Sequence, residues 1–391
     1  GLESAEAGRA ALEQTVVIKL NGGLGTSMGM TQAKSLLPLK EGLTFLDVIA
    51  RQIQWLQENT GHAVPLMLMN SFRTRDDSLA LLSRYGSLSG PLRPDFVQHK
   101  VPRIRVDDGT PVEWPAEPSH EWCPPGHGDL YTALLTSGLL DEMREAGLRF
   151  AFVSNADNLG AVLDLDLLGW FASSGAPFAM EVKERTAADR KGGHLAVRTD
   201  GGLTLREIAQ CPEEEKEEFE DIELYRYFNT NNLWLDLEAL RSAMQERDGI
   251  LGLPMIRNEK PVDPADAGSP RVYQLETAMG AAISAFRGAR AIRVPAHRFA
   301  PVKTTGDLLS VRSDAYRLAE DFRIVPAEGA SPEHTRIDLD PAFYRRVDQL
   351  DARFPKGAPF MRHCRRLEVV GDVHFGAGVE IRGEVRVEAP E

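Results

Sequence analysis

The hydrophobic residues of this chain alternate between short continuous runs and longer amphipathic segments. Residues 15–20 are apolar and partly β-branched and stop before a glycine pair, which predicts a strand. Residues 44–58 carry apolar side chains at near 3.6-residue spacing and predict a helix, and the run at 64–69 predicts the next strand. Further strands are expected at 150–153, 178–182 and 227–228.

Strands separated by segments of helix length indicate βαβ units. They predict an α/β fold in which a mixed, mostly parallel sheet is covered by helices on both faces. Ligands of such sheets bind beyond the carboxyl ends of the strands. Functional loops are therefore expected after Leu20, Val153 and Phe228.

The end of the chain follows a different pattern, in which apolar pairs recur every six residues. The pairs are Leu367/Val369, Val373/Phe375, Val379/Ile381 and Val385/Val387, and small residues keep the same period at Gly371, Ala377 and Gly383. Such a hexad repeat predicts a short left-handed β-helix, because its strands stack apolar positions into one column. Two ordinary hairpins with alternating polarity are the alternative.

These patterns suggest four segments along the chain. Residues 1–14 are expected to be an N-terminal tail, either frayed or the end of a helix. The main domain is expected at 15–310, a mainly helical connection at 311–366 and the β-helix at 367–391.

Composition excludes several classes of function. Of the 391 residues 42% are hydrophobic and 26% are charged, and the formal net charge of −13 disfavours a nucleic-acid-binding surface. The three cysteines form no CxxC pair, so a reducing compartment and a cytoplasmic location are expected. No apolar run reaches the roughly 20 residues that span a membrane, so no membrane contact is expected.

The most informative segment is the glycine loop at 20–29, LNGGLGTSMG. Glycines directly after a strand let backbone N–H groups approach an anion closely. Met28 stands where a dinucleotide GxGxxG motif needs glycine, and the loop does not match a Walker A motif. A lysine, Lys34, follows in AKSLLP. Taken alone, the loop is explained equally well as a glycine-rich turn beside a surface lysine.

Eight separated blocks remove much of that ambiguity. They are KLNGGLGTSMG (19–29), PLMLMNSF (65–72), PPGHGDLY (124–131), FVSNADNLGA (152–161), KGGHLA (191–196), FNTNNLW (228–234), QLETAMGAAI (274–283) and PVKTTGDLL (301–309). In this order they resemble the eukaryotic-type UDP-glucose pyrophosphorylases along almost the whole chain, and the hexad tail matches too. The resemblance implies a Rossmann-like nucleotidyltransferase domain. It also implies that the chain transfers the uridylyl group of UTP to glucose 1-phosphate with Mg²⁺, forming UDP-glucose and pyrophosphate.

The resemblance also implies nucleotide contacts by a set of residues spread along the chain: Leu20, Asn21, Gly22, Gly23, Lys34, Gln98, Gly126, Asn155 and Lys303. Lys34 and Lys303 would be the catalytic lysines on the phosphates, where a compact charge on a flexible stem is suitable. Gln98 would read uracil through an amide that both donates and accepts. Neither a Ser-His-Asp nor a Cys-His signature is found, which agrees with in-line attack on the α-phosphorus without a covalent nucleophile.

The resemblance makes Asp157, directly after the strand at 150–153, the magnesium ligand. A single aspartate is sufficient, since Mg²⁺ prefers one or two carboxylates plus substrate phosphate oxygens. Asp164-Leu165-Asp166 resembles the DxD of glycosyltransferases, but its apolar surroundings indicate a structural role. The resemblance assigns sugar contacts to five residues: His127, Gly193, Asn229, Asn231 and Glu276.

Three alternatives stay open at this point. The sugar could be galactose or N-acetylglucosamine, the chain could be a glycosyltransferase that consumes a UDP-sugar, or it could be a nucleotide-sugar sensor without catalysis.

The glycine loop departs from the family at one place. Eukaryotic members have CKGP where this chain has Met30-Thr31-Gln32-Ala33, which removes one loop lysine. A homo-oligomer formed through the C-terminal β-helix is the expected assembly.

Overall fold

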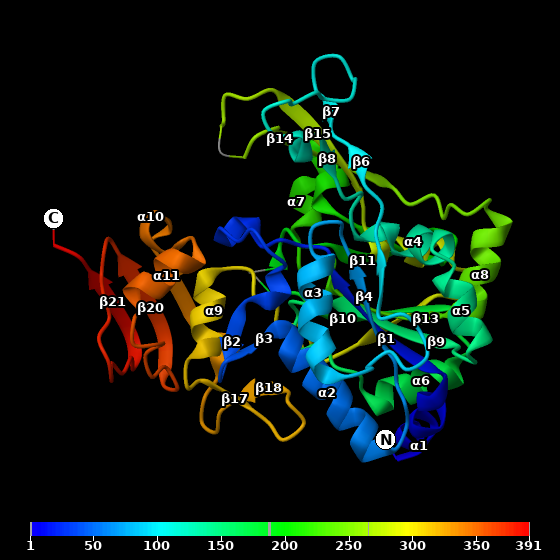
Figure 1. Cartoon of the computed structure of the whole chain (residues 1–391), viewed down its shortest axis with the longest axis horizontal. Helices are drawn as coiled ribbons and strands as arrows, with labels where there is room; N and C mark the ends of the chain where they lie inside the picture. Colours follow the sequence, from blue (N-terminus) through cyan, green and yellow to red (C-terminus); the bar gives the residue numbers. More distant parts are fainter. Residues whose placement is uncertain (1, 187–188, 265, 391) are drawn as a thin grey trace.

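A nine-stranded sheet lies at the centre of the computed structural model, which describes residues 2–186, 189–264 and 266–390 (Figure 1). Seven strands follow in the order β12-β11-β13-β9-β1-β4-β5, while β10 pairs with β13 and β16. Their bounds are β1 Thr15–Asn21, β4 Leu66–Asn70, β5 Asp95–Val97, β9 Phe150–Asn155, β10 Phe178–Glu184, β11 His194–Val197, β12 Leu203–Arg206, β13 Tyr227–Asp236 and β16 Arg290–Arg293.

Strand β1 runs parallel to both of its neighbours, β4 and β9, and β4 runs parallel to β5. All seven residues of β1 are buried, because both faces of the sheet are covered. Within this sheet β13 and β12 run against the other strands. The predicted mixed, mostly parallel sheet is therefore confirmed.

The strand expected at 227–228 is much longer than its apolar start suggested. β13 continues through Asn229 and Asn231 to Asp236, with a register irregularity opposite Met180 and Val182. Because β13 is antiparallel to β9, its first residues lie at the same edge of the sheet as the carboxyl ends of β1 and β9. Asn229 and Asn231 thus reach this edge from inside a strand and not from a loop.

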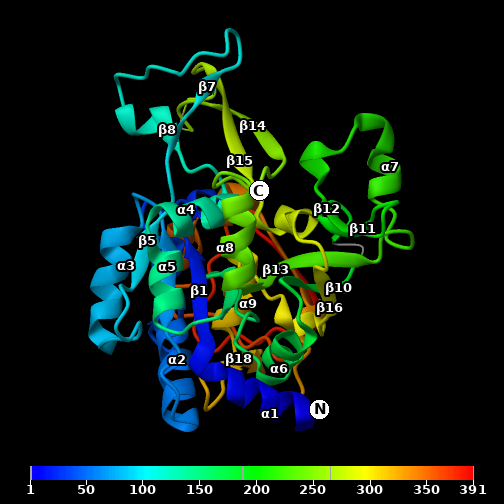
Figure 2. The same cartoon turned by 90° about the vertical axis from the view of Figure 1, so that its right-hand side faces the viewer.

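Helices cover both faces, as predicted (Figures 1 and 2). One face carries α4 (Leu130–Thr136), α5 (Leu139–Glu145) and α8 (Leu237–Glu246), and the other carries α2 (Phe45–Thr60), α3 (Arg75–Leu82) and α6 (Leu165–Ser174). The helix expected at 44–58 is α2. It begins after Thr44, whose hydroxyl accepts from the Asp47 N–H, and it ends at Gly61 in the left-handed region.

The beginning of the chain forms α1 (Leu2–Ala11), which packs along α6. A Cβ atom on Gly8 would lie 1.9 Å from the carbonyl oxygen of Leu165, and one on Gly169 would lie 1.7 Å from that of Ser4. Glycine is therefore required on both helices for this close approach. The segment expected to be a frayed tail or the end of a helix is therefore helical over residues 2–11.

Two small antiparallel sheets project from the main sheet beside the carboxyl edge, at the top of Figure 1. The larger one contains β14 (Met255–Pro261), β15 (Arg271–Thr277) and β7 (Ile104–Arg105), and the smaller one contains β6 (Val101–Pro102) and β8 (Trp122–Cys123). They matter for function because β15 and β8 supply part of the pocket described below.

The last part of the chain, to the left in Figure 1, packs in a third apolar cluster that it shares with Met28, Leu37 and Phe45. Residues 311–366 differ from the expected helical connection, since three strands precede the short helices α10 (Pro341–Tyr344) and α11 (Val347–Arg353) there. Those strands are β17 (Tyr316–Leu318), β18 (Ile324–Pro326) and β19 (Arg336–Leu339). Strand β19 forms by pairing with a strand beyond residue 360, a non-local contact that local periodicity does not reveal.

The hexad segment contains β20 (Cys364–Val370) and β21 (Gly383–Glu388), which pair in parallel. Leu367 lies opposite Val385, and Val369 lies opposite Val387, so each pair joins positions three hexads apart. Leu367, Val369, Phe375 and Ile381 are buried in the same cluster as α9 (Thr305–Arg312). The parallel pairing rules out the two antiparallel hairpins. No helix among the described residues combines the length and apolar character needed to cross a membrane.

Candidate active site

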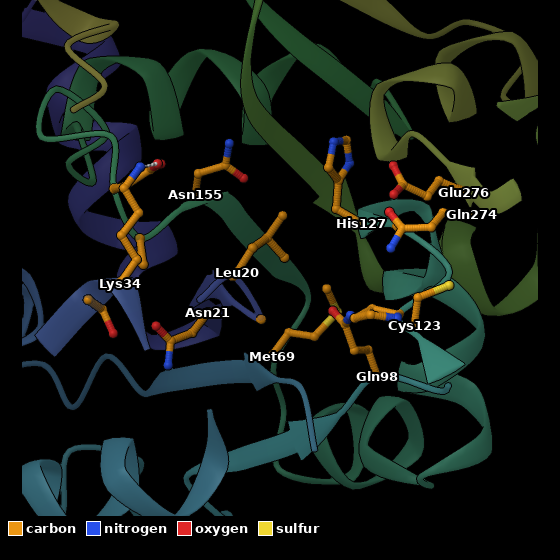
Figure 3. Close-up of a pocket in the computed structure, with 17 residues that line it drawn as sticks. Leu20, Asn21, Lys34, Met69, Gln98, Cys123, His127, Asn155, Gln274 and Glu276 are labelled. Carbon is orange, nitrogen blue, oxygen red and sulfur yellow. Dashed lines mark hydrogen bonds and ion pairs between the residues drawn. The ribbon is translucent and has the colours of Figure 1, made fainter. Parts of the chain in front are cut away.

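A cavity of about 300 Å³ opens at the carboxyl edge of the main sheet. The ends of β1, β4 and β9 and the loops after β1, β5 and β9 form one part of its wall, and β8, β15 and the turn after β8 form the rest. Its lining residues are Leu20, Asn21, Gly22, Gly23, Lys34, Ser35, Met69, Gln98, Cys123, Pro124, Gly126, His127, Asn155, Ala156, Asp157, Gln274 and Glu276. The structure therefore brings together most of the residues selected from the sequence. Figure 3 shows Lys34 and Asn155 at one end of the cavity and His127, Gln98, Gln274 and Glu276 at the other.

The glycine loop folds back so that Gly23 contacts the backbone of Lys34. The Lys34 N–H donates to the carbonyl oxygen of Gly23 at 3.0 Å, and Gly25 has a φ of +60°, which favours glycine. A Cβ atom on Gly22 would lie 2.7 Å from Oε1 of Gln98. The loop and the Gln98 amide therefore approach each other closely across the cavity wall.

Asn21 lines the cavity, but its side chain is used elsewhere. Its Nδ2 donates to Oδ1 of Asn70 and to Oγ of Ser78, each at 2.8 Å. These hydrogen bonds fasten the end of β1 to β4 and to α3. The side chain of Asn21 is therefore occupied. The contact with a nucleotide that the resemblance implies for Asn21 would have to come from its backbone.

Lys34 and Asp157 form an ion pair across the mouth of the glycine loop. Their Nζ and Oδ2 atoms are 2.5 Å apart, and the side chains are 17% and 26% exposed. Asp157 follows β9, whose last residue, Asn155, also lines the cavity. The two charged groups selected for the phosphates and the metal are thus direct neighbours.

His127 is held as a neutral ring with a defined tautomer. Its Nδ1 accepts a hydrogen bond from the Met279 N–H at 2.9 Å, so the ring proton is on Nε2. Burial lowers the pKa of His127 to about 4. His127 can therefore donate from Nε2 near neutral pH without carrying a charge.

The turn before His127 requires glycine at Gly126. Its φ is +81°, and a Cβ atom there would lie 2.6 Å from the carbonyl oxygen of Thr277. The Thr277 N–H in turn donates to the carbonyl oxygen of Pro125 at 2.9 Å. These contacts press the turn against β15, so its backbone is well defined.

The far end of the cavity is rich in amide and carboxyl groups. Gln98 is 7% exposed, and its amide makes no hydrogen bond within the part of the chain that the structure describes. Glu276 accepts from Nδ2 of Asn258 at 3.0 Å, and burial raises the pKa of Glu276 above its usual range. Gln274, two residues earlier on β15, was missed from the sequence although it lies in the QLETAMG block. Strand alternation places it on the side of Glu276, and this signal could have identified it.

Lys303 does not line this cavity. Its Nζ lies 5.5 Å from the ring centroid of Phe299, a cation–π distance. The chain nevertheless runs beside the metal candidate, because the Val302 N–H donates to the carbonyl oxygen of Asp157 at 3.2 Å. The backbone of Lys303 is therefore near the site while its ammonium group is directed at an aromatic ring.

Gly193, Asn229 and Asn231 form a second group beside the cavity. The Asn229 N–H donates to the Gly193 carbonyl oxygen at 3.0 Å, and the two asparagine side chains are hydrogen-bonded to each other. Glu207 also belongs here, because a Cβ atom on Gly193 would lie 2.6 Å from its Oε1. Burial raises the pKa of Glu207. Glu207 was missed, since its approach depends on the pairing of His194 with Arg206.

The donor set suits magnesium better than a transition metal. The described residues contain no group of three His, Cys, Asp or Glu side chains that could hold a metal ion. Asp157 offers one carboxylate beside a glycine loop, and Mg²⁺ completes its coordination with water and substrate phosphates. Asp164, the rival from the DxD-like segment, is the N-cap of α6, where its Oδ1 accepts from the Leu167 N–H at 3.0 Å. Its structural interpretation is confirmed.

These features define the class of enzyme to which the chain belongs. An α/β sheet that presents a glycine loop, a lysine and a single aspartate at its carboxyl edge, opposite an unpaired amide, is the arrangement of a nucleotidyltransferase. The family model for UTP–glucose-1-phosphate uridylyltransferases matches residues 2–382. The chain belongs to this family, and its activity is that of a UTP–glucose-1-phosphate uridylyltransferase, which produces UDP-glucose.

Individual relatives agree with the family match. The chain is 42% identical to the UTP–glucose-1-phosphate uridylyltransferase of Pyrus pyrifolia over 99% of this chain and 80% of the relative. It is 40% identical to that of Saccharomyces cerevisiae over 96% and 74%. The UDP-glucose phosphorylase of Trypanosoma brucei superposes with a TM-score of 0.90 at 47% identity, covering 97% of this chain and 82% of that one. A Leishmania major UDP-glucose pyrophosphorylase variant in complex with UDP-glucose gives 0.89 at 46%, with the same coverage.

Proposed function

We propose that the uridylyl group is transferred within the 300 Å³ cavity, by in-line attack of glucose 1-phosphate on the α-phosphorus of UTP. The observation that carries the proposal is the meeting of the glycine loop, Lys34, Asp157, His127 and Gln98 around one cavity. Both reactants are anions, so the site must cancel their repulsion and align them. This task needs fixed charges and donors rather than a nucleophilic side chain.

The nucleotide is proposed to lie along the cavity from Gln98 to Lys34. The unpaired Gln98 amide can donate to and accept from the uracil edge, while the Gly126 backbone lies against the base. At the other end the backbone N–H groups of Gly22 and Gly23 face the phosphates, with Lys34 as their counter-charge. Asn155 and the backbone of Leu20 and Asn21 complete the nucleotide contacts.

Asp157 would hold Mg²⁺ together with phosphate oxygens, and the ion would supply charge neutralisation at the reacting phosphates. Lys34 already lies against Asp157, so metal and lysine compete for the same carboxylate. The release of Lys34 toward the phosphates would accompany metal binding. Lys303 is the second proposed catalytic lysine and reaches the phosphates by leaving Phe299.

Glucose 1-phosphate is proposed to occupy the side of the cavity near β11 and β13. Gly193, Asn229, Asn231 and Glu207 offer donors and acceptors for sugar hydroxyls. His127 can donate its Nε2–H to the sugar phosphate. Glu276 belongs to the same set, since its carboxyl group lines the cavity.

The β20–β21 segment is proposed to be one coil of a left-handed β-helix that supports a homo-oligomer. The pairing of residues three hexads apart is the register expected of such a coil. Strand β21 lies at the edge of its sheet and could pair with further strands. A cytoplasmic location is also part of the proposal, because Cys123, Cys211 and Cys364 are free.

A pyrophosphate-release assay tests the proposal directly. Purified protein should release pyrophosphate only when UTP, glucose 1-phosphate and Mg²⁺ are all present. Equal rates with galactose 1-phosphate or N-acetylglucosamine 1-phosphate would contradict the assignment of the sugar. Consumption of UDP-glucose without pyrophosphate would instead indicate a glycosyltransferase, and binding without turnover would indicate a sensor.

A further inference from the structure

A second cavity, of about 190 Å³, lies on the other side of the loop that follows β9. Its walls come from β1, from α2, from the loop at 159–164 and from the β17–β18 hairpin, which lies beside α2 in Figures 1 and 2. Nε2 of Gln52 on α2 donates to the Phe322 carbonyl oxygen at the tip of this hairpin at 3.1 Å. The cavity is therefore enclosed by elements that are tied to one another.

The walls are apolar on one side and carry charged side chains of both signs elsewhere. The two carboxylates are already used, because Asp321 pairs with Arg323 and Asp164 caps α6. Ile49, Ile53 and Leu56 of α2 are buried along the apolar side, next to Trp55. On the opposite side two cationic side chains line the cavity, Lys19 at 3% exposure and Arg298 at 6%. The cavity thus offers both an apolar body and a polar end to an occupant.

The two cations differ in how their charge is balanced. Arg298 forms two hydrogen bonds to Glu181, from Nε at 3.0 Å and from Nη2 at 2.6 Å. Lys19 has no carboxylate partner among the described residues. Its Nζ donates to Oγ of Ser154 at 2.8 Å and to the Ala161 carbonyl oxygen at 2.6 Å.

An ammonium group has three N–H donors, and two of those of Lys19 have hydrogen-bond partners among the described residues, while the Phe152 ring centroid lies 5.7 Å from its Nζ. Burying the charge of Lys19 is costly, and Glu181, which attracts it, is hydrogen-bonded to Arg298, so a bound anion would offset the remaining cost. Burial, with Arg298 nearby, lowers the pKa of Lys19 to about 7, and a carboxylate beside it would favour the charged form.

We infer that this cavity is a binding site for a small molecule with one carboxylate on a short apolar body, with Lys19 as the carboxylate ligand. The volume corresponds to roughly six water molecules, which matches an acid of about six carbons. The alkyl chain would lie against Ile49, Ile53 and Leu56, and the carboxylate would take the third donor of Lys19. The site goes beyond the uridylyltransferase reaction and shares no lining residue with the first cavity.

One loop separates the two cavities and gives the second site a route to catalysis. Asn155–Asp157 line the first cavity, and residues 159–164 line the second. Asn158 stands between them in the sequence, and its side chain is hydrogen-bonded to Gly160 and Arg298 of the second cavity and to Ala300. Its Oδ1 accepts from the Gly160 and Ala300 N–H groups at 3.1 and 2.9 Å, and its Nδ2 donates to the Arg298 carbonyl oxygen at 3.2 Å.

Lys19 also holds this loop, through the Ala161 carbonyl oxygen. A bound carboxylate that accepts a hydrogen bond from the Lys19 ammonium group would therefore affect the position of the loop that carries Asp157. Occupation of the second cavity should change the Mg²⁺ concentration that gives half-maximal activity, by at least twofold.

Calorimetry with sodium hexanoate tests the site, with UDP-glucose present at saturation so that the first cavity is filled. Hexanoate should bind with a 1:1 stoichiometry, and hexan-1-ol, which lacks the charge, should bind at least tenfold more weakly. Lys19→Met should reduce hexanoate affinity at least tenfold. Lys40→Met is the matched control, because Lys40 also donates to two carbonyl oxygens but lines neither cavity.

A second variant keeps the test decisive if Lys19→Met does not fold. Ile53→Trp should fill the cavity and abolish hexanoate binding while Lys19 remains. Equal binding of hexanoate and hexan-1-ol, unsaturable binding, or hexanoate binding that is seen only when UDP-glucose is left out would overturn the site. A saturable site that leaves the Mg²⁺ dependence unchanged would overturn the coupling. The binding result does not depend on the residue roles proposed for uridylyl transfer, whereas the coupling rests on Asp157 as the proposed Mg²⁺ ligand.

Discussion

The ammonium nitrogen of Lys34 lies 2.5 Å from Oδ2 of Asp157, so the lysine and the aspartate of the phosphate end neutralise each other. Both side chains are mostly buried, and an ion pair of this kind contributes about 1 kcal/mol. In the proposed mechanism, Mg²⁺ and substrate phosphates replace this contact before either group acts on the reaction. Under this proposal, the Lys34–Asp157 ion pair has to be broken before the catalytic arrangement can form.

Lys34→Met should raise the affinity of the protein for Mg²⁺ alone, because Asp157 then has no competing cation. The expected gain is roughly fivefold, equivalent to about 1 kcal/mol. Isothermal titration calorimetry without nucleotide measures it. Weaker Mg²⁺ binding in this variant would show that Lys34 supports the metal and does not compete with it.

Asp157→Asn keeps the size of the side chain but removes the charge proposed to hold Mg²⁺. Turnover should fall by about 10²–10³-fold, as when one electrostatic group of a reacting centre is lost. Asp164→Asn is the matched control, because asparagine can also cap α6, and its turnover should stay near normal. The reverse ranking of these two variants in the pyrophosphate assay would identify Asp164 as the functional carboxylate.

Gln98→Ala should lower the ratio of kcat/KM for UTP to kcat/KM for ATP. Loss of two hydrogen bonds to uracil should lower kcat/KM for UTP by about 10- to 100-fold, while the value for ATP changes little. Gln54→Ala, an amide on α2 that binds the Tyr85 carbonyl oxygen, is the control. An unchanged UTP/ATP ratio would remove Gln98 from base recognition.

The parts of the fold that follow from local pattern were predictable from the sequence. β1, β4 and β9 are short apolar runs, and α2 has a regular apolar face, a Thr44 cap and a terminal glycine. Parallel strands place their carboxyl ends together, which is why the loops after β1 and β9 meet at one cavity.

The parts that depend on pairing between distant segments were not predictable in this way. Glu207 reaches Gly193 because β12 folds back on β11. β19 forms because β20 pairs with it, although the intervening chain looked helical. The position of the Lys303 ammonium over Phe299 depends on a side-chain rotamer, which no spacing in PVKTT specifies.

His194 should make the fold sensitive to acid. Burial, with Arg185 and Arg206 nearby, lowers the pKa of His194 from 6.5 to about 3. Between these values the unfolded chain binds a proton on this ring and the folded chain does not, so the free energy of unfolding falls as the pH falls. At pH 5 the loss is roughly 2 kcal/mol.

His194→Phe should remove this loss, because phenylalanine can keep the contacts with Tyr225 and Phe219. Urea unfolding at pH 7.5 and pH 5 measures the difference between the two midpoints. The difference should shrink in His194→Phe and remain in His334→Gln, whose side chain is 82% exposed. An equal acid shift in the wild type and His194→Phe would mean that other groups cause it.

Truncation after Arg382 should separate association from catalysis. It removes β21 but keeps β20, whose Leu367 and Val369 are buried in the apolar cluster beside α9. If β21 joins protomers, light scattering should report a smaller mass at the same concentration, while turnover per site stays near normal. The same mass with and without β21 would contradict an assembly role for this strand.

The last prediction concerns Lys303, whose ammonium group lies over Phe299 while its backbone lies next to that of Asp157. Lys303→Ala removes a positive charge that is proposed to act where the two anions meet. If this charge acts mainly as negative charge shifts between phosphates, the loss should appear in kcat, by about 10²–10³-fold. The KM for UTP should change less, because Lys34 and the glycine loop remain.

Lys303→Arg distinguishes charge from geometry. The planar guanidinium is larger and directs its donors differently, so this variant should recover little of the lost kcat. Lys356→Ala, a change in another exposed lysine that lines neither cavity, controls for the loss of net charge and should leave kcat unchanged. A Lys303→Ala enzyme with near-normal kcat and only a raised KM would show that Lys303 binds the ground state and transition state equally, and that Lys34 is the lysine on which the reaction depends.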